Sequence, residues 1–316
     1  MTSVTPLSLA SRIERDCTRR LKAWNEAVCG ARDPQGGAPL HDLRVASRRL
    51  LVTLSVWREL FRPRRRRKAR RVLRALRRRL GPARDLEAQA ARLAALASSY
   101  PDEEKRAAEE IRQRVLARLA PRMHRLALDL DRPRFRLLAK SLGRSIRGMG
   151  DDRDDLAAVI ARARSRAARV EDSLAHGLLA ILERDDVRSL HEARILVRTC
   201  RYTSECLEAG TGAGTRLPGL VDLQRALGAI HDGAALERRA AKRAKCLRAA
   251  SHEEGARACE SLARLLATER AASLERARIC ALGIAAWSGR RARSPSGAGG
   301  PSPSGSPRAS IARELP

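Results

Sequence analysis

The chain has 316 residues, and its 65 Lys and Arg residues outnumber its 36 Asp and Glu residues, which gives a formal net charge of +29. Aromatic residues make up only 2% of the sequence, which argues against a sandwich or barrel rich in Tyr, Phe and Trp. No uncharged apolar run reaches about 18 residues, so we expect no membrane-spanning helix. A protein this basic is expected to bind a polyanion.

The sequence predicts an all-α protein. Ala, Leu, Arg and Glu dominate, and apolar residues recur three and four positions apart. The turn signals Arg62-Pro63 and Gly81-Pro82 are expected to separate helices, and Pro121 allows a bend. The expected helices span residues 7–29, 40–61, 64–80, 83–98, 102–130, 133–148, 154–183, 187–209, 216–230, 233–249 and 252–287. From Ser288 onward, Ser, Gly, Pro and Arg predict a disordered tail over 288–316.

Two pairs of matching segments indicate an internal duplication. The sequence HDLRVASR at 41–48 resembles HEARILVR at 191–198, with an offset of 150. Further along, LGPARD at 80–85 resembles LGAIHD at 227–232, with an offset of 147. Matches in the same order at nearly the same offset are typical of a repeat. We therefore expect two helical halves, each with enough helices for a bundle, over residues 1–150 and 151–287.

The matching segments place basic residues on one face of a helix. At about 100° per residue, His41, Arg44 and Arg48 form one stripe. The opposite, core-facing side of that helix carries Leu43, Leu50, Leu54, Trp57 and Phe61. The second copy repeats the stripe with His191, Arg194, Arg198 and Arg201, opposite Ala193, Leu196, Cys200 and Leu207. A solvated basic face would explain one such stripe, but the repetition of the same positions favours a binding site.

The following helix is the most basic part of the chain. Residues 41–80 have a net charge of +14. We expect this helix to contribute Arg67, Arg70, Arg71 and Arg74 to polyanion binding. As an alternative, acids of the same chain would neutralise it, namely Asp85, Glu87, Glu103, Glu104, Glu109 and Glu110. The preference for Arg over Lys, 59 to 6, fits either phosphate recognition or a GC-rich genome.

No motif for catalysis or metal binding is evident. The seven cysteines include no CxxC pair and are expected to be free thiols of a cytosolic protein. The sequence lacks HExxH, GxSxG, GxxxxGK[ST] and GxGxxG. We therefore expect no cofactor, no metal site and no enzymatic activity.

The segments HDLRVASRR, HEARILVRTCRY and LQRALGAIHD resemble the CHAD domain, the conserved histidine α-helical domain, and the resemblance extends over about residues 7–287. It implies two pseudo-symmetric four-helix bundles with a basic central groove or cavity, which binds inorganic polyphosphate and associates with polyphosphate granules in the cytoplasm. The sequence departs from the family pattern at Leu51 and Thr199, where basic residues are usual, and it lacks the ExExK motif of neighbouring triphosphate-tunnel domains. Carried over by motif, the implied ligand residues are His41, Arg44, Arg48, Arg49, Arg84, His191, Arg194, Arg198, Arg201, Tyr202 and His231.

Nucleic-acid binding and phosphoryl transfer are the two alternatives to non-catalytic polyphosphate binding. The charge also suits a sequence-independent nucleic-acid binder that holds the backbone of duplex DNA or structured RNA. Proteins that bind single strands usually stack bases on aromatic side chains, whereas Trp24, Trp57, Phe61 and Tyr202 look core-bound or isolated. A phosphoryl-transfer enzyme is the least favoured function, because neither a nucleophile nor a metal site is evident.

Overall fold

The protein is described here by a computed structural model, which covers residues 8–32, 39–96, 100–147, 155–184, 186–212, 217 and 219–293. These residues form α-helices joined by short turns and contain no strand, so the predicted all-α class is confirmed. The helices are α1 (Leu9–Gly30), α2 (Pro39–Val56), α3 (Pro63–Leu96), α4 (Asp102–Leu130), α5 (Pro133–Arg147), α6 (Leu156–Glu183), α7 (Val187–Thr211), α8 (Leu220–Ala249) and α9 (Glu253–Arg293). A single 3₁₀ turn, Arg58–Leu60, follows α2.

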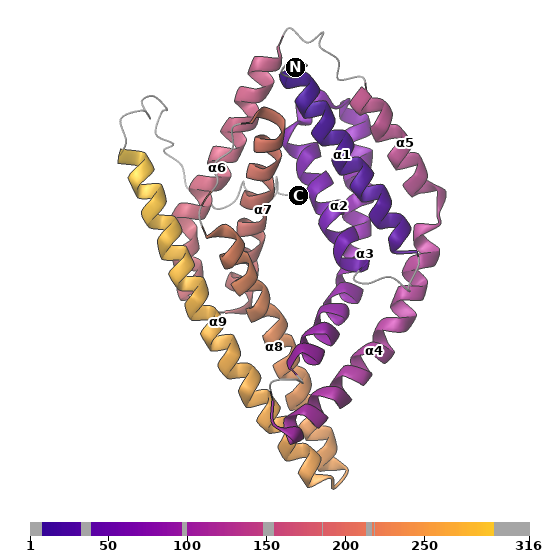
Figure 1. Ribbon diagram of the computed structural model, residues 1–316, viewed down its shortest axis with the longest axis vertical. Coiled ribbons are helices and arrows are strands. Elements are labelled where there is room, and N and C mark those ends of the chain that lie inside the picture. Colours follow the sequence, from indigo (N-terminus) through magenta and orange to yellow (C-terminus); the bar gives the residue numbers. More distant parts are fainter. Residues whose placement is uncertain are drawn as a thin grey trace, which may run out of the picture.

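Three hydrophobic cores organise the helices. The first core lies among α1, α2, α5 and the first half of α3, and it also takes in side chains of α6 and α7. The second core joins α6 and α7 to the first half of α8 and the last part of α9. The third core, which we call the tip, joins α3, α4, α8 and α9 where these helices converge at one end of the molecule (Figure 1).

The cores contain the apolar stripes that the sequence predicts. Leu43, Leu50 and Leu54 of α2 are buried, as are Trp57 and Phe61 after it. In α7 the predicted core residues Ala193, Cys200 and Leu207 are buried, and Leu196 packs against the second core. The stripe along α2 therefore faces the core, which leaves the His/Arg stripe of the same helix to face elsewhere.

Two predicted helix breaks are wrong. Helix α3 continues through Pro82, although a proline removes one hydrogen bond and crowds the preceding turn. Packing on both sides of the proline offsets this cost. Leu76 and Leu80 before it are buried in the first core, and Leu86 and Leu93 after it are buried at the tip. Helix α8 likewise runs unbroken through Gly228 and Gly233, since its buried apolar stripe continues on both sides of the glycines.

Two predicted helix ends also differ from the structure. The helix expected over 40–61 ends at Val56, and the chain becomes extended at Phe61, close to Pro63, which starts the next helix. Helix α9 runs to Arg293, so residues 288–293 extend a helix where a tail was expected. Arg and Ala are good helix formers, which outweigh the single glycine there. The rest of the predicted tail lies outside the described residues.

The seven cysteines are free thiols. Among the described helices, none combines the length and the apolar character that a membrane span requires.

Candidate functional site

The two His/Arg stripes meet at one place in the fold. Helices α2 and α7 contact each other directly, although they come from the matching segments 150 residues apart. Each turns its apolar face toward a core, so the basic faces are left to meet between the helices. Helix α3 packs against α2 and closes a third side.

Together these three helices enclose a cavity of about 150 Å³, which we call the central cavity. Its lining carries four guanidinium groups, one imidazole and one phenol, and the described residues that line it include no Asp or Glu. The lining residues are Arg44, Arg48, Val52, Arg77, His191, Ile195, Arg198, Thr199 and Tyr202.

Arg48 and Arg198 are the most buried cations of the cavity. Only 8% of Arg48 and 9% of Arg198 is exposed, although the sequence placed both on the helix faces opposite the predicted core. Burial, Arg77 and Arg44 lower the pKa of Arg48, while a hydrogen bond with Tyr202 acts in the opposite direction. Burial also lowers the pKa of Arg198, and Arg48 is the strongest of the neighbouring cations that add to this effect. Because a guanidinium keeps its proton in proteins, these shifts reflect the burial of charged groups and, after it, the crowding of positive charge.

One donor of Arg48 has no acceptor among the described residues, whereas a donor of Arg198 bonds to its own helix. Arg48 Nη2 is buried and makes no hydrogen bond within the described part of the chain. Arg198 Nε donates to the Arg194 carbonyl one turn earlier in α7, at 3.0 Å. A buried donor without an acceptor is costly, so the cavity is suited to receive a ligand rich in acceptor oxygens.

Arg77 is a cavity residue that the sequence analysis missed. Burial and its neighbours Arg44 and Arg74 lower its pKa. Helix geometry alone indicates that Arg77 faces inward, because it lies about 40° around α3 from the buried Leu73. By the same geometry Arg71 lies about 160° from Leu73 and points away.

A flanking group of four residues surrounds the cavity and comes from α2, α3, α7 and α8. Its members are His41, Arg84, Arg194 and His231. Arg84 Nη2 lies 3.3 Å from His41 Nδ1. Since a guanidinium has donors only, Nδ1 must accept and His41 must be neutral in this arrangement. Burial lowers the pKa of Arg194, which is opposed by Asp232 and Asp85 and reinforced by Arg44.

All three histidines of the site have a lowered pKa. Burial is the first cause for His41, followed by Arg84. Burial is also the first cause for His191, followed by Arg198, and for His231, followed by Arg194. The histidines are therefore neutral near pH 7 and become cationic more readily when an anion offsets the arginines.

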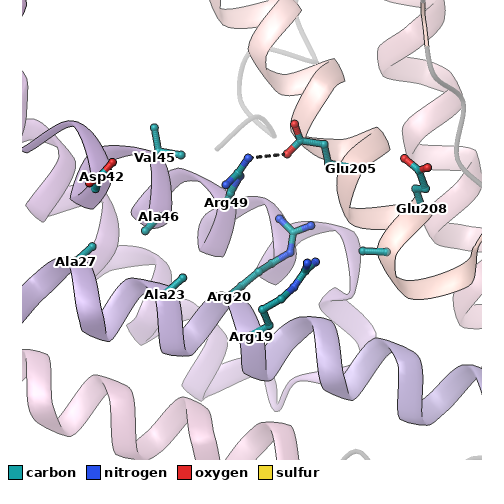
Figure 2. Close-up of a pocket in the computed structure, with 11 residues that line it drawn as sticks. Arg19, Arg20, Ala23, Ala27, Asp42, Val45, Ala46, Arg49, Glu205 and Glu208 are labelled. Atoms are coloured by element: carbon teal, nitrogen blue, oxygen red, sulfur yellow. Dashed lines mark ion pairs between the residues drawn. The ribbon is translucent and has the colours of Figure 1, made fainter. Parts of the chain in front are cut away.

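Arg49 and Arg201 do not reach the central cavity. Arg49 follows Arg48 and so points about 100° away from it around α2. Its guanidinium pairs with Glu205 at 3.3 Å, and Arg201 pairs with the same carboxylate at 2.8 Å. Arg49 instead lines a separate cleft of about 670 Å³ between α1, α2 and α7 (Figure 2).

That cleft has a mixed charge. Arg19 and Arg20 line it together with Arg49, and Asp42, Glu205 and Glu208 supply the acids. Figure 2 shows Arg49 reaching toward Glu205 across the cleft. The balance of charge makes this cleft a poor match for a polyanion.

The four candidate arginines of α3 are also outside the cavity lining. Arg67 and Arg71 are exposed, while Arg70 and Arg74 are half-buried. Arg74 is close enough to lower the pKa of Arg77. Of the four, Arg74 is the member whose charge acts on a cavity residue.

The acids proposed as an internal counter-charge mostly pair elsewhere. Glu109 binds Arg112 at 2.7 Å, and Glu110 contacts Arg114 and Arg243. Asp85 lies 3.9 Å from Arg44, and Glu87 lies 3.5 Å from Arg84. Asp85 therefore reaches Arg44 of the cavity lining and Glu87 reaches Arg84 of the flanking group, while Arg48 and Arg198 have no carboxylate beside them in the described lining.

The four aromatic side chains considered as stacking surfaces are buried. Trp24 and Trp57 are fully buried, and Phe61 and Tyr202 are also buried. Two cations lie near the Tyr202 ring, with Arg49 Cζ 5.7 Å and Arg201 Cζ 5.5 Å from its centre. Of the two departures from the family pattern, Leu51 is buried in the first core and Thr199 lines the cavity.

Fold and site together define an all-helical protein with a basic cavity between two sets of helices. A family model for the CHAD domain matches residues 12–241. The chain therefore belongs to the CHAD domain family, as its motifs predict.

Solved structures agree with this fold. The CHAD domain from the plant Ricinus communis superposes with a TM-score of 0.60 at 21% identity, over 89% of this chain and 94% of the plant domain. PptA from Streptomyces chartreusis gives a TM-score of 0.58 at 20% identity, over 86% of this chain and 98% of that protein. No curated protein matches the chain.

Proposed function

We propose that the protein binds inorganic polyphosphate in the central cavity without chemically altering it, and that this binding targets it to polyphosphate granules. The ligand residues are those of the cavity and of its flanking group. The observation that carries the proposal is the convergence of Arg44, Arg48, Arg77 and Arg198 on one space whose described lining has no carboxylate. Such like-charged groups repel one another unless an anion lies between them.

The size and chemistry of the cavity favour a phosphate chain over a nucleic acid. The phosphates of a duplex are attached to bulky sugars and fit a 150 Å³ space between three helices less well than a bare phosphate chain does. Trp24, Trp57, Phe61 and Tyr202 are buried, so unpaired bases could not stack on them. Polyphosphate has no bases or sugars, and each unit supplies acceptor oxygens that match guanidinium donors.

A competition titration tests the proposal. The double variant Arg44→Glu/Arg194→Glu is compared with Arg15→Glu/Arg257→Glu, which has the same change of net charge at exposed positions on α1 and α9. Affinity for long-chain polyphosphate is measured at matched salt, with duplex DNA and RNA as competitors. We expect the cavity variant to lose at least about tenfold more affinity than the control, since each phosphate contact is charge-assisted. Equal losses in both variants, or displacement by DNA at equal charge concentration, would overturn the proposal.

A further inference from the structure

A second basic groove lies at the tip, between α4 and α8. It has a volume of about 120 Å³, and its lining carries five cationic side chains. No Asp or Glu occurs among the described residues that line it. The lining residues are Ile111, Arg114, Val115, Arg118, Arg239, Lys242, Arg243 and Cys246.

The charges of this groove are only partly compensated. Arg243 contacts Glu110 at 2.5 Å and Arg114 contacts the same carboxylate oxygen at 3.1 Å, so two cations share one acid. The Arg243 Nε group is buried and has no hydrogen-bond partner within the described chain. Burial lowers the pKa of Arg239, and the neighbouring Arg118 and Arg122 lower it further. The groove is therefore a positively charged concavity in which a hydrogen-bond donor has no acceptor in the part of the chain that the structure describes.

Helix α8 connects the groove to the central cavity. His231 belongs to the flanking group, and Lys242 lines the groove. The two residues are eleven positions apart, which places them within about 20° of each other around the helix and about 16 Å apart along it. Arg238 lies between them on the same face and is exposed. One face of α8 thus carries His231, Arg238 and Lys242 in succession from the central cavity to the tip.

We propose that the α4/α8 groove is a second phosphate-binding subsite, so that a long polyphosphate chain occupies the central cavity and the groove at once. This inference rests on the proposed function of the cavity. A short chain that reaches only one site gains one set of contacts, whereas a long chain gains the second set at a high effective concentration. The groove thus makes the protein selective for chain length.

The test compares long-chain polyphosphate with a short oligophosphate in the full-length protein. The groove variant Arg118→Glu/Lys242→Glu changes two exposed side chains, and Arg15→Glu/Arg257→Glu again serves as the control of equal charge. Dissociation constants are measured at one salt concentration, and the ratio of short-chain to long-chain constants is compared between variants. The general loss of electrostatic attraction is larger for the longer anion, and comparison with the equal-charge control accounts for it.

We expect the groove variant to weaken long-chain binding at least about tenfold relative to the control, with less than about a twofold change for the short chain. An unchanged ratio, or an equal loss for both lengths, would overturn the subsite. The cavity variant Arg44→Glu/Arg194→Glu tests the proposed function separately. If it binds both short and long polyphosphate as tightly as the control does, the proposed function fails, whatever the groove variant does.

Discussion

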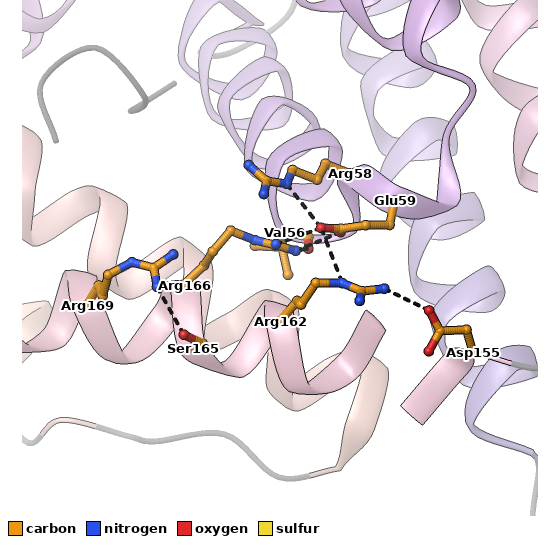
Figure 3. Close-up of polar contacts among 8 residues, drawn as sticks. All are labelled: Val56, Arg58, Glu59, Asp155, Arg162, Ser165, Arg166 and Arg169. Atoms are coloured by element: carbon orange, nitrogen blue, oxygen red, sulfur yellow. Dashed lines mark hydrogen bonds and ion pairs between the residues drawn. The ribbon is translucent and has the colours of Figure 1, made fainter. Parts of the chain in front are cut away.

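The guanidinium group of Arg166 in α6 donates to both carboxylate oxygens of Glu59, each at 2.8 Å, and this pair joins the second half of the chain to the first (Figure 3). The same guanidinium donates to the Val56 carbonyl at the end of α2, at 2.6 Å. Only 14% of the Arg166 side chain and 21% of the Glu59 side chain is exposed. The pair is thus a shielded, two-point contact beside the first core.

Removing this contact should destabilise the protein. We expect Arg166→Met to lower the free energy of unfolding by about 2 kcal/mol, because it leaves a shielded carboxylate without its main partner. Denaturant unfolding measures the change. Arg162→Met is the control, since Arg162 lies 3.9 Å from Glu59 and is 47% exposed, and it should cost less than about 1 kcal/mol. Equal costs for the two variants would contradict the central position given to Arg166.

The effect of Arg166→Met should depend on pH. Burial raises the pKa of Glu59, but hydrogen bonds from Arg166 and Arg58 outweigh this and leave the pKa lowered. A carboxylate with a lowered pKa stabilises the folded state above its unfolded pKa of about 4.3, and this stabilisation is lost as the pH falls through the folded value. The difference between wild type and variant should therefore be full at pH 7 and shrink in acid, as followed by urea unfolding across pH.

Replacing a cavity arginine should stabilise the free protein and weaken ligand binding. Arg198→Met keeps the apolar stem and removes one of several crowded positive charges, so we expect unfolding to cost about 1–3 kcal/mol more in the absence of polyphosphate. Polyphosphate should raise the melting temperature of the wild type more than that of the variant. In Arg225, 74% of the side chain is exposed. Arg225→Met should therefore change neither the free energy of unfolding nor the rise in melting temperature with polyphosphate appreciably. A less stable Arg198→Met protein would contradict the crowding argument.

Polyphosphate affinity should rise as the pH falls from about 8 to about 5.5. His41, His191 and His231 have lowered pKa values in the free protein, with burial as the first cause. A bound polyanion favours their charged forms, so binding takes up protons and is strengthened by acid. Titrations of the triple His→Gln variant should show a flatter pH profile. His124→Gln/His252→Gln, at exposed positions, should keep the wild-type slope.

The free protein should respond to acid in the opposite sense. A histidine whose folded pKa lies below its unfolded pKa of about 6.5 binds protons more readily after unfolding. Such a histidine leaves the free energy of unfolding unchanged above pH 6.5 and lowers it as the pH falls below that value. Wild type should therefore lose stability below pH 6.5 faster than the triple His→Gln variant, as measured by thermal unfolding without polyphosphate. Saturating polyphosphate should reduce or reverse that loss.

The sequence alone predicts the helical class, the buried faces and part of the site. Helical periodicity separates Leu43 and Leu50 from His41 and Arg44, because it depends only on local geometry. It does not predict that Arg48 and Arg198 become buried, since that requires α2 and α7 to meet across the two halves.

The remaining differences also come from contacts distant in sequence. The motif match groups Arg49 with Arg48, whereas in the fold Arg49 pairs with Glu205 on α7. Pro82 carries a local signal to end a helix, but packing at both ends of α3 overrides it. Arg77 was recognisable from its position beside Leu73 and was missed because no motif includes it.

The division of the central cavity between α2 and α7 has a consequence for synthesis. The two helices supply most of its lining but are separated in the chain by residues 57–186, so a ribosome completes α2, α3 and α4 long before α7 emerges. Until then the arginines of α2 lack the opposite wall that would hold a ligand between them. A nascent chain, surrounded by ribosomal RNA, thus has no completed cavity, because the opposite wall forms only after the second half has been made.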